Sequence, residues 1–441
     1  MLSRMIQSFL LSGMTALLIA CGGGGASTSA TTQSLAGVAA IGTALANATV
    51  TLKDSTGKTE TTTTDESGNF SFSNVSSFTP PLMLQVKGSA AGTSYVLHSL
   101  MTTTPAQGTN TLNVTPATDA IVTQTLGADP AVTFNDASKI KNIDPAKLAD
   151  AKAKLLAALK DAMSNLNIDN MDVMTGKFTA DKTGMDKLFD LVEFSSNSTN
   201  GEIQLTNKNT RSSTTVNSNT ATNSVTKLVL SKEEASLDLS GIDKFVQSLI
   251  NAYNNKDQNA FSQLTDSAYL NQGENLEMAK AGFSTNIAKL SGAGYAVKKC
   301  DPNTKVCSGI LNIKISGVTY PQFMPIKLGA DGKWRAYGNQ APFDIDFYPI
   351  YIHSESINSS TKIATQTKDT VGIALNFSGD SCGECNDKKY KSSVFEMSID
   401  GGQSYSSLFK LKSKTITNTN NSTYTISMGL VDGNGNVNAL E

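Results

Sequence analysis

The chain has 441 residues, which exceeds what one hydrophobic core supports and predicts several domains. Its 36 basic and 38 acidic residues give a formal net charge of −2, so there is no electrostatic case for binding nucleic acid or an acidic membrane surface. Aromatic residues are scarce and Trp334 is the single tryptophan, whereas Thr, Ser and Asn are abundant, which suits β-domains with solvated faces.

The N-terminal stretch has the features of a secretory signal. Arg4 precedes a nearly uncharged apolar run over residues 5–19, which is shorter than the roughly 20 apolar residues that span a bilayer. The run ends in Leu-Ile-Ala-Cys at residues 18–21, which resembles the lipobox of bacterial lipoproteins. This resemblance implies that residues 1–20 are removed, that the Cys21 thiol carries a diacylglycerol, and that the new amino group is acylated. The alternative is an ordinary secretory signal in which Cys21 is incidental.

The residues around Cys21 favour an anchor in the outer membrane. Several acyl chains hold a protein stably to a bilayer, because each buried methylene contributes about 0.8 kcal/mol. By analogy with enterobacterial lipoproteins, Gly22 in place of an aspartate favours the outer membrane, on its periplasmic or its surface-exposed face. Residues 21–34 are rich in Gly, Ser and Thr, so we expect a flexible tether.

Residues 35–115 alternate apolar and polar side chains in short runs, which predicts a small β-sandwich. The patterns A-x-V-T-L at 48–52 and T-D-x-x-G-x-F-x-F at 64–72 resemble the carboxypeptidase regulatory-like (transthyretin-like) domain. The resemblance implies a structural or binding module without peptidase activity, in which Asp65 and Gly68 build a turn and Phe70 and Phe72 enter the core.

Carboxylates in the turns of this module raise the question of a metal. Asp54, Asp65 and Glu66 offer oxygen ligands of the kind that calcium accepts. Turn residues of this type more often form local hydrogen bonds, so we predict no metal and no cofactor.

Residues 116–206 change to a helical period. A short helix is expected over residues 117–124, and Asp144 followed by Pro145 predicts the start of a longer one with an apolar stripe. A further helix is expected around residues 184–192 and a strand at 202–205. The segments 178–181 and 185–190 are similar to the helical segment that follows the regulatory-like domain in proteobacterial lipoproteins. The polar residues 207–236 are expected to form a linker or a solvated ribbon.

Residues 237–348 predict three helices followed by an antiparallel sheet, an α+β plan in which Ser240 is expected to cap the first helix and Leu290 to lie on the third. This order, with Leu-Gly-Ala-Asp-Gly-Lys-Trp-Arg at 328–335, resembles the NTF2-like family, whose cone-shaped fold holds a pocket and includes isomerases and dehydratases. Such a pocket would draw on residues that can donate hydrogen bonds or exchange protons, namely Tyr253, Tyr295, Tyr337, Asp344 and Asp346. They form no recognisable catalytic set, so we do not predict an enzyme.

Apart from Cys21, the cysteines form two close pairs, as expected in an oxidising compartment. Cys300 and Cys307 flank a loop between two strands, and Cys382 and Cys385 form a C-x-x-C motif in a polar loop. Local pairing into two disulfides is the favoured connectivity among the three that four cysteines permit. A redox-active Cys382–Cys385 pair is the alternative, although a thioredoxin-like setting is missing from the sequence.

Residues 349–441 return to alternating β-patterns. The segments 398–405 and 432–437 are similar to the strand-turn signatures of bacterial Ig-like and fibronectin-like sandwiches.

Together these patterns predict a multidomain, mainly β protein with an α+β part: a β-sandwich, a helical segment, an NTF2-like cone and an Ig-like sandwich. We expect a lipid-anchored outer-membrane protein with a non-enzymatic binding or scaffolding role toward an envelope protein or glycan. The alternative is a small-ligand carrier or an enzyme that uses the pocket of the NTF2-like domain.

Overall fold

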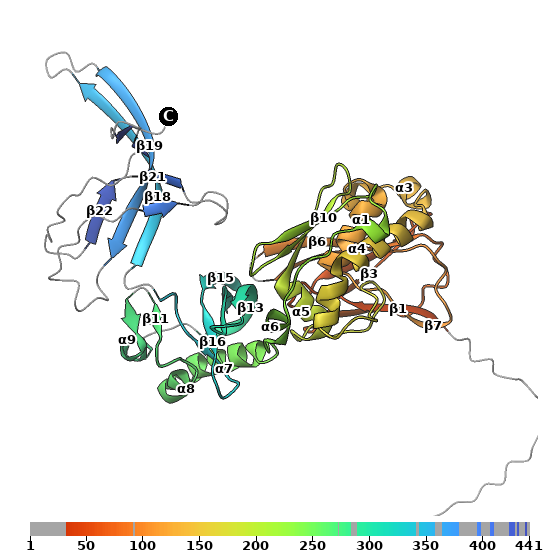
Figure 1. The fold of residues 1–441 in the computed structure, drawn as a ribbon, viewed down its shortest axis with the longest axis horizontal. Helices are drawn as coiled ribbons and strands as arrows, with labels where there is room; N and C mark the ends of the chain where they lie inside the picture. The colour runs from red at the N-terminus through yellow and green to blue at the C-terminus, as the bar shows by residue number, and fades with distance from the viewer. Residues whose placement is uncertain are drawn as a thin grey trace, which may run out of the picture.

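The computed structural model describes residues 32–90, 93–271, 273–283 and 289–340, and the backbone of strands between residues 344 and 438 (Figure 1). It consists of several separate β-sheets with a smaller number of helices. This agrees with the prediction of a mainly β multidomain fold. Below, residues 32–115 are called the first module, residues 116–236 the second and residues 237–340 the third.

The first module is built from two sheets. The strand order is β4-β1-β7 in one and β3-β2-β5-β6 in the other. The alternation predicted at residues 48–52 and 70–72 is confirmed, because Val50, Leu52, Phe70 and Phe72 are all buried in one cluster that joins the two sheets. The strands are β1 (Gln33–Val38), β2 (Thr49–Asp54), β3 (Thr59–Thr63), β4 (Asn69–Phe72), β5 (Leu82–Ala90), β6 (Thr93–Met101) and β7 (Gly108–Thr111).

Helices cover the outer face of the larger sheet. Alternate residues of β5 and β6, such as Met83 and Leu100, point away from the sandwich core and pack against Val122, Phe134 and other side chains of the next helices in a second buried cluster. The helices are α1 (Pro116–Leu126), α2 (Pro130–Phe134), α3 (Ala137–Lys141) and α4 (Pro145–Asn165).

The predicted helix starts are confirmed by their caps. The Asp144 side chain accepts a hydrogen bond from the Ala146 N–H, and Pro145 follows at the first helical position. The Thr115 hydroxyl caps α1 through a capping box with Thr118.

The predicted linker at 207–236 contains regular structure. Helix α5 (Gly184–Leu191) leads into a sheet of order β10-β9-β8, formed by β8 (Val192–Ser196), β9 (Ile203–Asn207) and β10 (Ser213–Val216). Thr214 and Val216 are buried alternately in β10, and η1 (Thr222–Ser224) and α6 (Lys232–Ser236) follow. Composition hid this strand because Val216 is its only apolar residue and its other buried side chain is polar: Thr214 Oγ1 donates to Thr226 O at 2.9 Å.

The third module places helices before a five-stranded sheet, in agreement with the predicted order. Strand β15 follows a tight turn in which Ser316 and Gly317 both have positive φ. The sequence did not predict this strand, because Pro321 lies inside it and proline argues against a strand. The elements are α7 (Ile242–Asn255), α8 (Gln258–Gln263), β11 (Leu270–Asn271), β12 (Glu274–Asn275), α9 (Leu276–Gly282), β13 (Leu290–Asp301), β14 (Val306–Ile315), β15 (Val318–Phe323), β16 (Ile326–Leu328) and β17 (Trp334–Ala336).

Two details of this module differ from expectation. Leu290, expected on the third helix, begins β13 instead, because it pairs with Ile315 of β14. Helix α7 starts after Gly241, and the Ser240 hydroxyl binds the Asp238 carboxylate rather than capping the helix.

Toward the C-terminus the backbone again forms antiparallel strands. Strand β18 crosses the domain boundary expected at residue 348 and pairs with β19 along its length, and β22 pairs with the other edge of β19. The strands are β18 (Asp344–Ile357), β19 (Ala364–Ser378), β20 (Phe395–Met397), β21 (Ser406–Phe409), β22 (Thr423–Ser427), β23 (Leu430–Val431) and β24 (Val437–Asn438).

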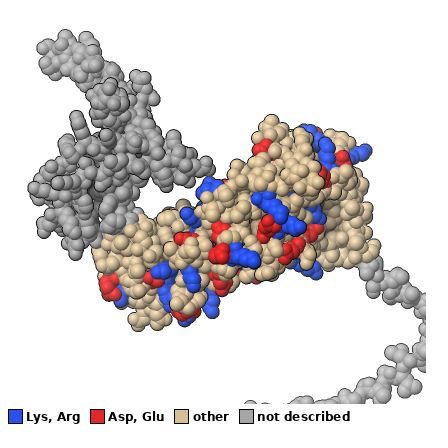
Figure 2. Space-filling model, in the orientation of Figure 1, with Lys and Arg blue, Asp and Glu red and all other residues tan. Residues whose placement is uncertain are grey.

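One buried cluster runs from Leu35 to Ala336, so the three modules share a continuous core. On the face seen in Figure 2, acidic and basic side chains are interspersed over the described surface, and neither sign dominates it. Among the described residues, no helix combines the length and the apolar character needed to cross a bilayer.

Candidate functional site

The lipidation residue and one cysteine pair lie outside the described residues. Cys21 belongs to residues 1–31, and Cys382 and Cys385 belong to residues 379–394. The lipid anchor and the second disulfide therefore stay predictions.

The predicted disulfide between Cys300 and Cys307 is confirmed. The two residues are direct partners in the β13–β14 ladder, with Cα atoms 4.0 Å apart, and both are buried. The Cys300 N–H also donates to Asn209 Oδ1 at 2.6 Å, which links this end of the sheet to the second module. The disulfide links the two strands of the β13–β14 hairpin at the place where this sheet contacts the second module.

Tyr295, a predicted pocket residue, is an interior side chain of the sheet. It is 1% exposed, and its hydroxyl lies 3.1 Å from Cys307 O and 2.8 Å from Met324 O, to which it donates. Its ring lies over Gly309, where a Cβ atom would approach it to 2.5 Å. Burial raises the pKa of Tyr295 well above its ordinary value. The polar contacts of the hydroxyl are therefore with main-chain carbonyl groups of the sheet.

The other predicted pocket residues do not converge on Tyr295. The Tyr253 ring packs against the rings of Phe261 and Phe283, at centroid distances of 5.7 and 4.7 Å. The Tyr337 ring lies under Lys327 Nζ at 4.8 Å from the ring centroid. Asp344 and Asp346 are on strand β18, and their side chains are outside the described part of the chain.

Sequence reasoning missed two groups beside Tyr253. Tyr269 and Glu274 are both partly buried, and the Glu274 charge acts on both tyrosines. Burial raises the pKa of Tyr269 and of Tyr253, and it also raises the pKa of Glu274. Glu274 lies on β12 and Tyr269 immediately precedes β11, and these two-residue strands carry too little periodicity to be recognised in the sequence.

A hollow of about 910 Å³ lies elsewhere on the third module. Polar side chains of α7, α8 and β17 line it, including Asn251, Gln263 and Arg335, and it contains none of the predicted pocket residues. The Arg335 guanidinium is already paired with both oxygens of Asp331, at 2.8 and 2.7 Å.

The turn carboxylates of the first module act as local hydrogen-bond acceptors, as predicted. Asp54 accepts from the N–H groups of Thr56, Lys58 and Thr79 at 2.8–2.9 Å. Asp65 accepts from Ser67 N and Asn69 N in the next turn. Within the described ranges, no three His, Cys, Asp or Glu side chains gather closely enough to hold a metal ion.

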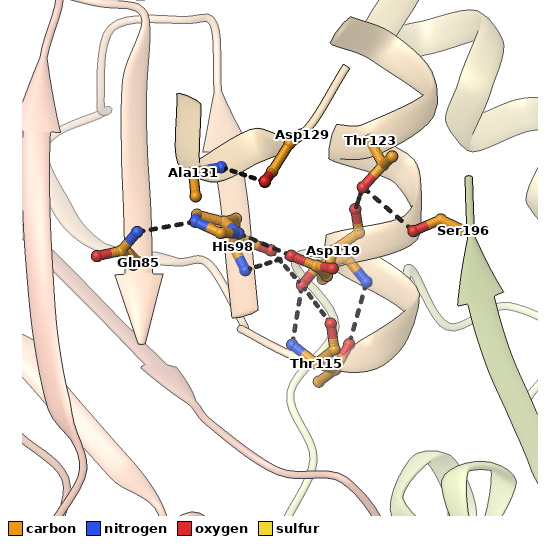
Figure 3. Close-up of polar contacts among 9 residues, drawn as sticks. Gln85, His98, Thr115, Asp119, Thr123, Asp129, Ala131 and Ser196 are labelled. Atoms are coloured by element: carbon orange, nitrogen blue, oxygen red, sulfur yellow. Dashed lines mark hydrogen bonds and ion pairs between the residues drawn. The ribbon is translucent and has the colours of Figure 1, made fainter. Parts of the chain in front are cut away.

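His98 forms a buried polar network with Gln85 and Asp119 (Figure 3). His98 Nδ1 lies 2.8 Å from Asp119 Oδ1, and because an ionised carboxylate can only accept, Nδ1 is the donor. His98 Nε2 then accepts from Gln85 Nε2 at 3.0 Å, and the His98 N–H donates to the same Asp119 oxygen at 2.9 Å. A histidine oriented by a carboxylate can serve as a general base, but this one is 2% exposed and its second nitrogen is occupied. The network therefore ties α1 to strands β5 and β6.

Buried charged side chains form a cluster on and just before α5, and no sequence pattern predicted this cluster. Lys182, Asp186 and Asp190 are all buried, and so is Lys187, which donates to Ala235 O at 2.5 Å and to Leu237 O. The apolar side chains of α5 share one face, which predicts that the opposite, charged face is solvated, but in the structure every residue from Met185 to Leu191 is buried.

No protein-family model, no curated protein and no solved structure matches the chain.

Proposed function

We propose that this protein is a lipid-anchored component of the cell envelope, held in the outer membrane, with a non-enzymatic binding or scaffolding role. The observation that carries the proposal is Leu-Ile-Ala-Cys at residues 18–21, after a short apolar run and before four glycines. In the proposed arrangement a regulatory-like β-sandwich lies nearest the membrane, followed by the helical segment, an NTF2-like module and an Ig-like sandwich.

The polar side chains best suited to catalysis are bound to other groups of the protein, which supports a non-enzymatic role for the described modules. Tyr295 and His98 are the groups best suited to chemistry by type, and both are buried with their polar atoms bound to other protein groups. The continuous core supports a scaffold, because an anchor at the N-terminus would then position the third module as well.

The anchor is tested by mass spectrometry of the mature N-terminus. We expect a peptide that begins at Cys21 and carries acyl groups, and we expect the protein in the membrane fraction. Cys21→Ser should leave the chain outside that fraction, whereas the matched control Cys382→Ser should keep it there. An unmodified Cys21, or a mature terminus downstream of it, would remove the basis of the proposal.

The binding role is tested by chemical cross-linking in intact cells followed by recovery of the full chain. The control is a protein that carries residues 1–34 in front of an unrelated soluble domain. We expect a specific envelope protein or glycan to be enriched over this control, and equal recovery from both would contradict the binding role.

A further inference from the structure

The charged cluster at α5 lies where the three modules meet. Lys182, in the turn before α5, sends its Nζ atom into the first module, where it donates to Gly42 O at 2.5 Å and Thr43 Oγ1 at 3.2 Å. Thr43 Oγ1 in turn lies 3.4 Å from Tyr295 O of β13 in the third module. The same Lys182 Nζ is 3.5 Å from Asp190 Oδ1. One ammonium group therefore connects a loop of the first module, a helix of the second and, through Thr43, a strand of the third.

The two carboxylates of the cluster are buried and incompletely bonded. Asp186 is 0% exposed and Asp190 3% exposed, and their four-residue spacing puts them on one face of α5. Asp186 Oδ2 accepts from the Lys182 N–H at 2.8 Å, but Asp186 Oδ1 and Asp190 Oδ2 have no hydrogen-bond partner in the described structure. A buried oxygen without a partner costs more when its carboxyl group is ionised than when it is neutral.

The remaining charges near the pair come from every element packed against α5. Lys208 Nζ donates to Phe189 O at 2.7 Å and attracts the Asp190 charge. Asp243 of α7 repels both carboxylates, although it is exposed. Lys187 of α5 itself is also attracted to Asp190, whereas Glu193 of β8 and Lys298 of β13 act on Lys208, and Asp181 before α5 acts on Asp243.

This environment favours the neutral form of a buried carboxyl group. Burial, reinforced by the charge of Asp190, raises the pKa of Asp186 to about 7. Burial likewise raises the pKa of Asp190 to about 6, against the opposing attraction of Lys182. Burial also opposes the charge on Lys182, but the surrounding carboxylates outweigh it and raise the Lys182 pKa, so this lysine stays protonated.

We propose that Asp186 and Asp190 form a proton-dependent latch between the modules. A proton bound to this pair keeps α5 packed against the loop at Gly42 and against β13. Loss of this proton weakens the contacts between these segments. The sign follows from linkage. A carboxyl group with a raised pKa in the closed form stabilises that form at low pH, and this stabilisation is lost as the pH rises toward 7. The latch goes beyond the anchoring role and does not depend on it.

Hydrogen exchange of the full chain tests the latch. If one carboxyl group has a pKa of about 7 when closed and an ordinary value when open, the closed-to-open ratio falls roughly 20-fold between pH 5.5 and 7.5. After correction for the intrinsic pH dependence of exchange, we expect a loss of protection of this size in α5 and β13. The range stops at pH 7.5 because burial lowers the pKa of Lys208 to about 8.

Asp186→Asn imitates the neutral carboxyl group and should remove the pH response, with protection at pH 7.5 close to that of the unchanged chain at pH 5.5. Asp161→Asn is the matched control, since Asp161 is an exposed residue of α4 paired with Lys227, and it should keep the 20-fold response. If Asp186→Asn does not fold, Asp190→Asn removes the charge that reinforces the raised pKa of Asp186 and should make the pH response smaller than 20-fold; a response equal to that of the control would again overturn the proposal. Protection that is independent of pH in the unchanged chain, or an Asp186→Asn response equal to that of the control, would overturn the proposal.

Discussion

Replacing Tyr295 with phenylalanine tests whether this side chain holds the sheet or serves a pocket. The substitution keeps the ring, which packs over Gly309, and removes only the hydroxyl. The carbonyls of Cys307 and Met324 then lose their shared donor. Leaving buried acceptors unsatisfied costs about 1–3 kcal/mol, so we expect the free energy of unfolding to fall by that amount.

The assay is urea unfolding followed by the fluorescence of Trp334, the single tryptophan, which is buried in the same sheet. With a denaturant slope of about 2 kcal/mol/M, a loss of about 2 kcal/mol lowers the urea midpoint by roughly 1 M. Tyr337→Phe is the matched control, because the Tyr337 ring contact with Lys327 does not involve the hydroxyl, and its midpoint should not move.

An unchanged or raised midpoint for Tyr295→Phe would refute this reasoning. The hydroxyl would then make no net contribution to stability, and a role in ligand binding would regain support. Tyr295→Ala gives a second measure, because it also removes the ring and should cost about 3–5 kcal/mol, as large-to-small core substitutions of aromatic residues do.

Three further substitutions test other parts of the structure. Replacing Cys300 and Cys307 together with serine opens a short covalent ring and should cost about 2–3 kcal/mol, seen as a lower urea midpoint; an unchanged midpoint would contradict a structural bond. Burial opposes the charge of Asp54, but the hydrogen bonds that its carboxylate accepts outweigh burial and lower its pKa. The ionised carboxylate therefore stabilises the fold at a pH above the ordinary pKa of aspartate. This stabilisation is lost as the pH falls through the lower pKa of Asp54 in the folded chain. Asp54→Asn should therefore lower the free energy of unfolding by about 1–3 kcal/mol at pH 7 and by less at pH 3, and an equal loss at both would contradict this. Gly68→Ala should lower the free energy of unfolding by at least about 1–2 kcal/mol, because φ is +79° and a Cβ atom would lie 2.5 Å from Ala39 O. The measurement is thermal unfolding, and an unchanged melting temperature would show that the turn adjusts to the added Cβ atom.

Features that depend on neighbours in the chain were predictable from the sequence. The alternation at residues 48–52 and 70–72 predicted strands whose apolar side chains are buried in the structure. Asp144 before Pro145 predicted the start of α4, because a cap acts on the first turn of its own helix. Cys300 and Cys307 were expected to pair because they flank one short loop, and they do.

Features that depend on distant segments were decided by tertiary packing. Gln85, His98 and Asp119 meet only because α1 folds back onto β5 and β6. Strand β10 was hidden because only one of its two buried side chains, Val216, is apolar, and the other, Thr214, is buried with a hydrogen bond to a residue 12 positions away. Tyr295 looked suited to a pocket by residue type, but the carbonyls that occupy its hydroxyl belong to residues 12 and 29 positions away.

The sequence by itself therefore predicted several strands and helices and one disulfide, since periodicity, caps and short loops act within a few residues. Tertiary structure alone decided which polar groups are buried and what they bind, including Asp186 and Asp190. Desolvation and hydrogen bonding depend on atoms that the fold brings together from remote parts of the chain, and this is why the ionisation of these carboxyl groups differs from that of an ordinary aspartate.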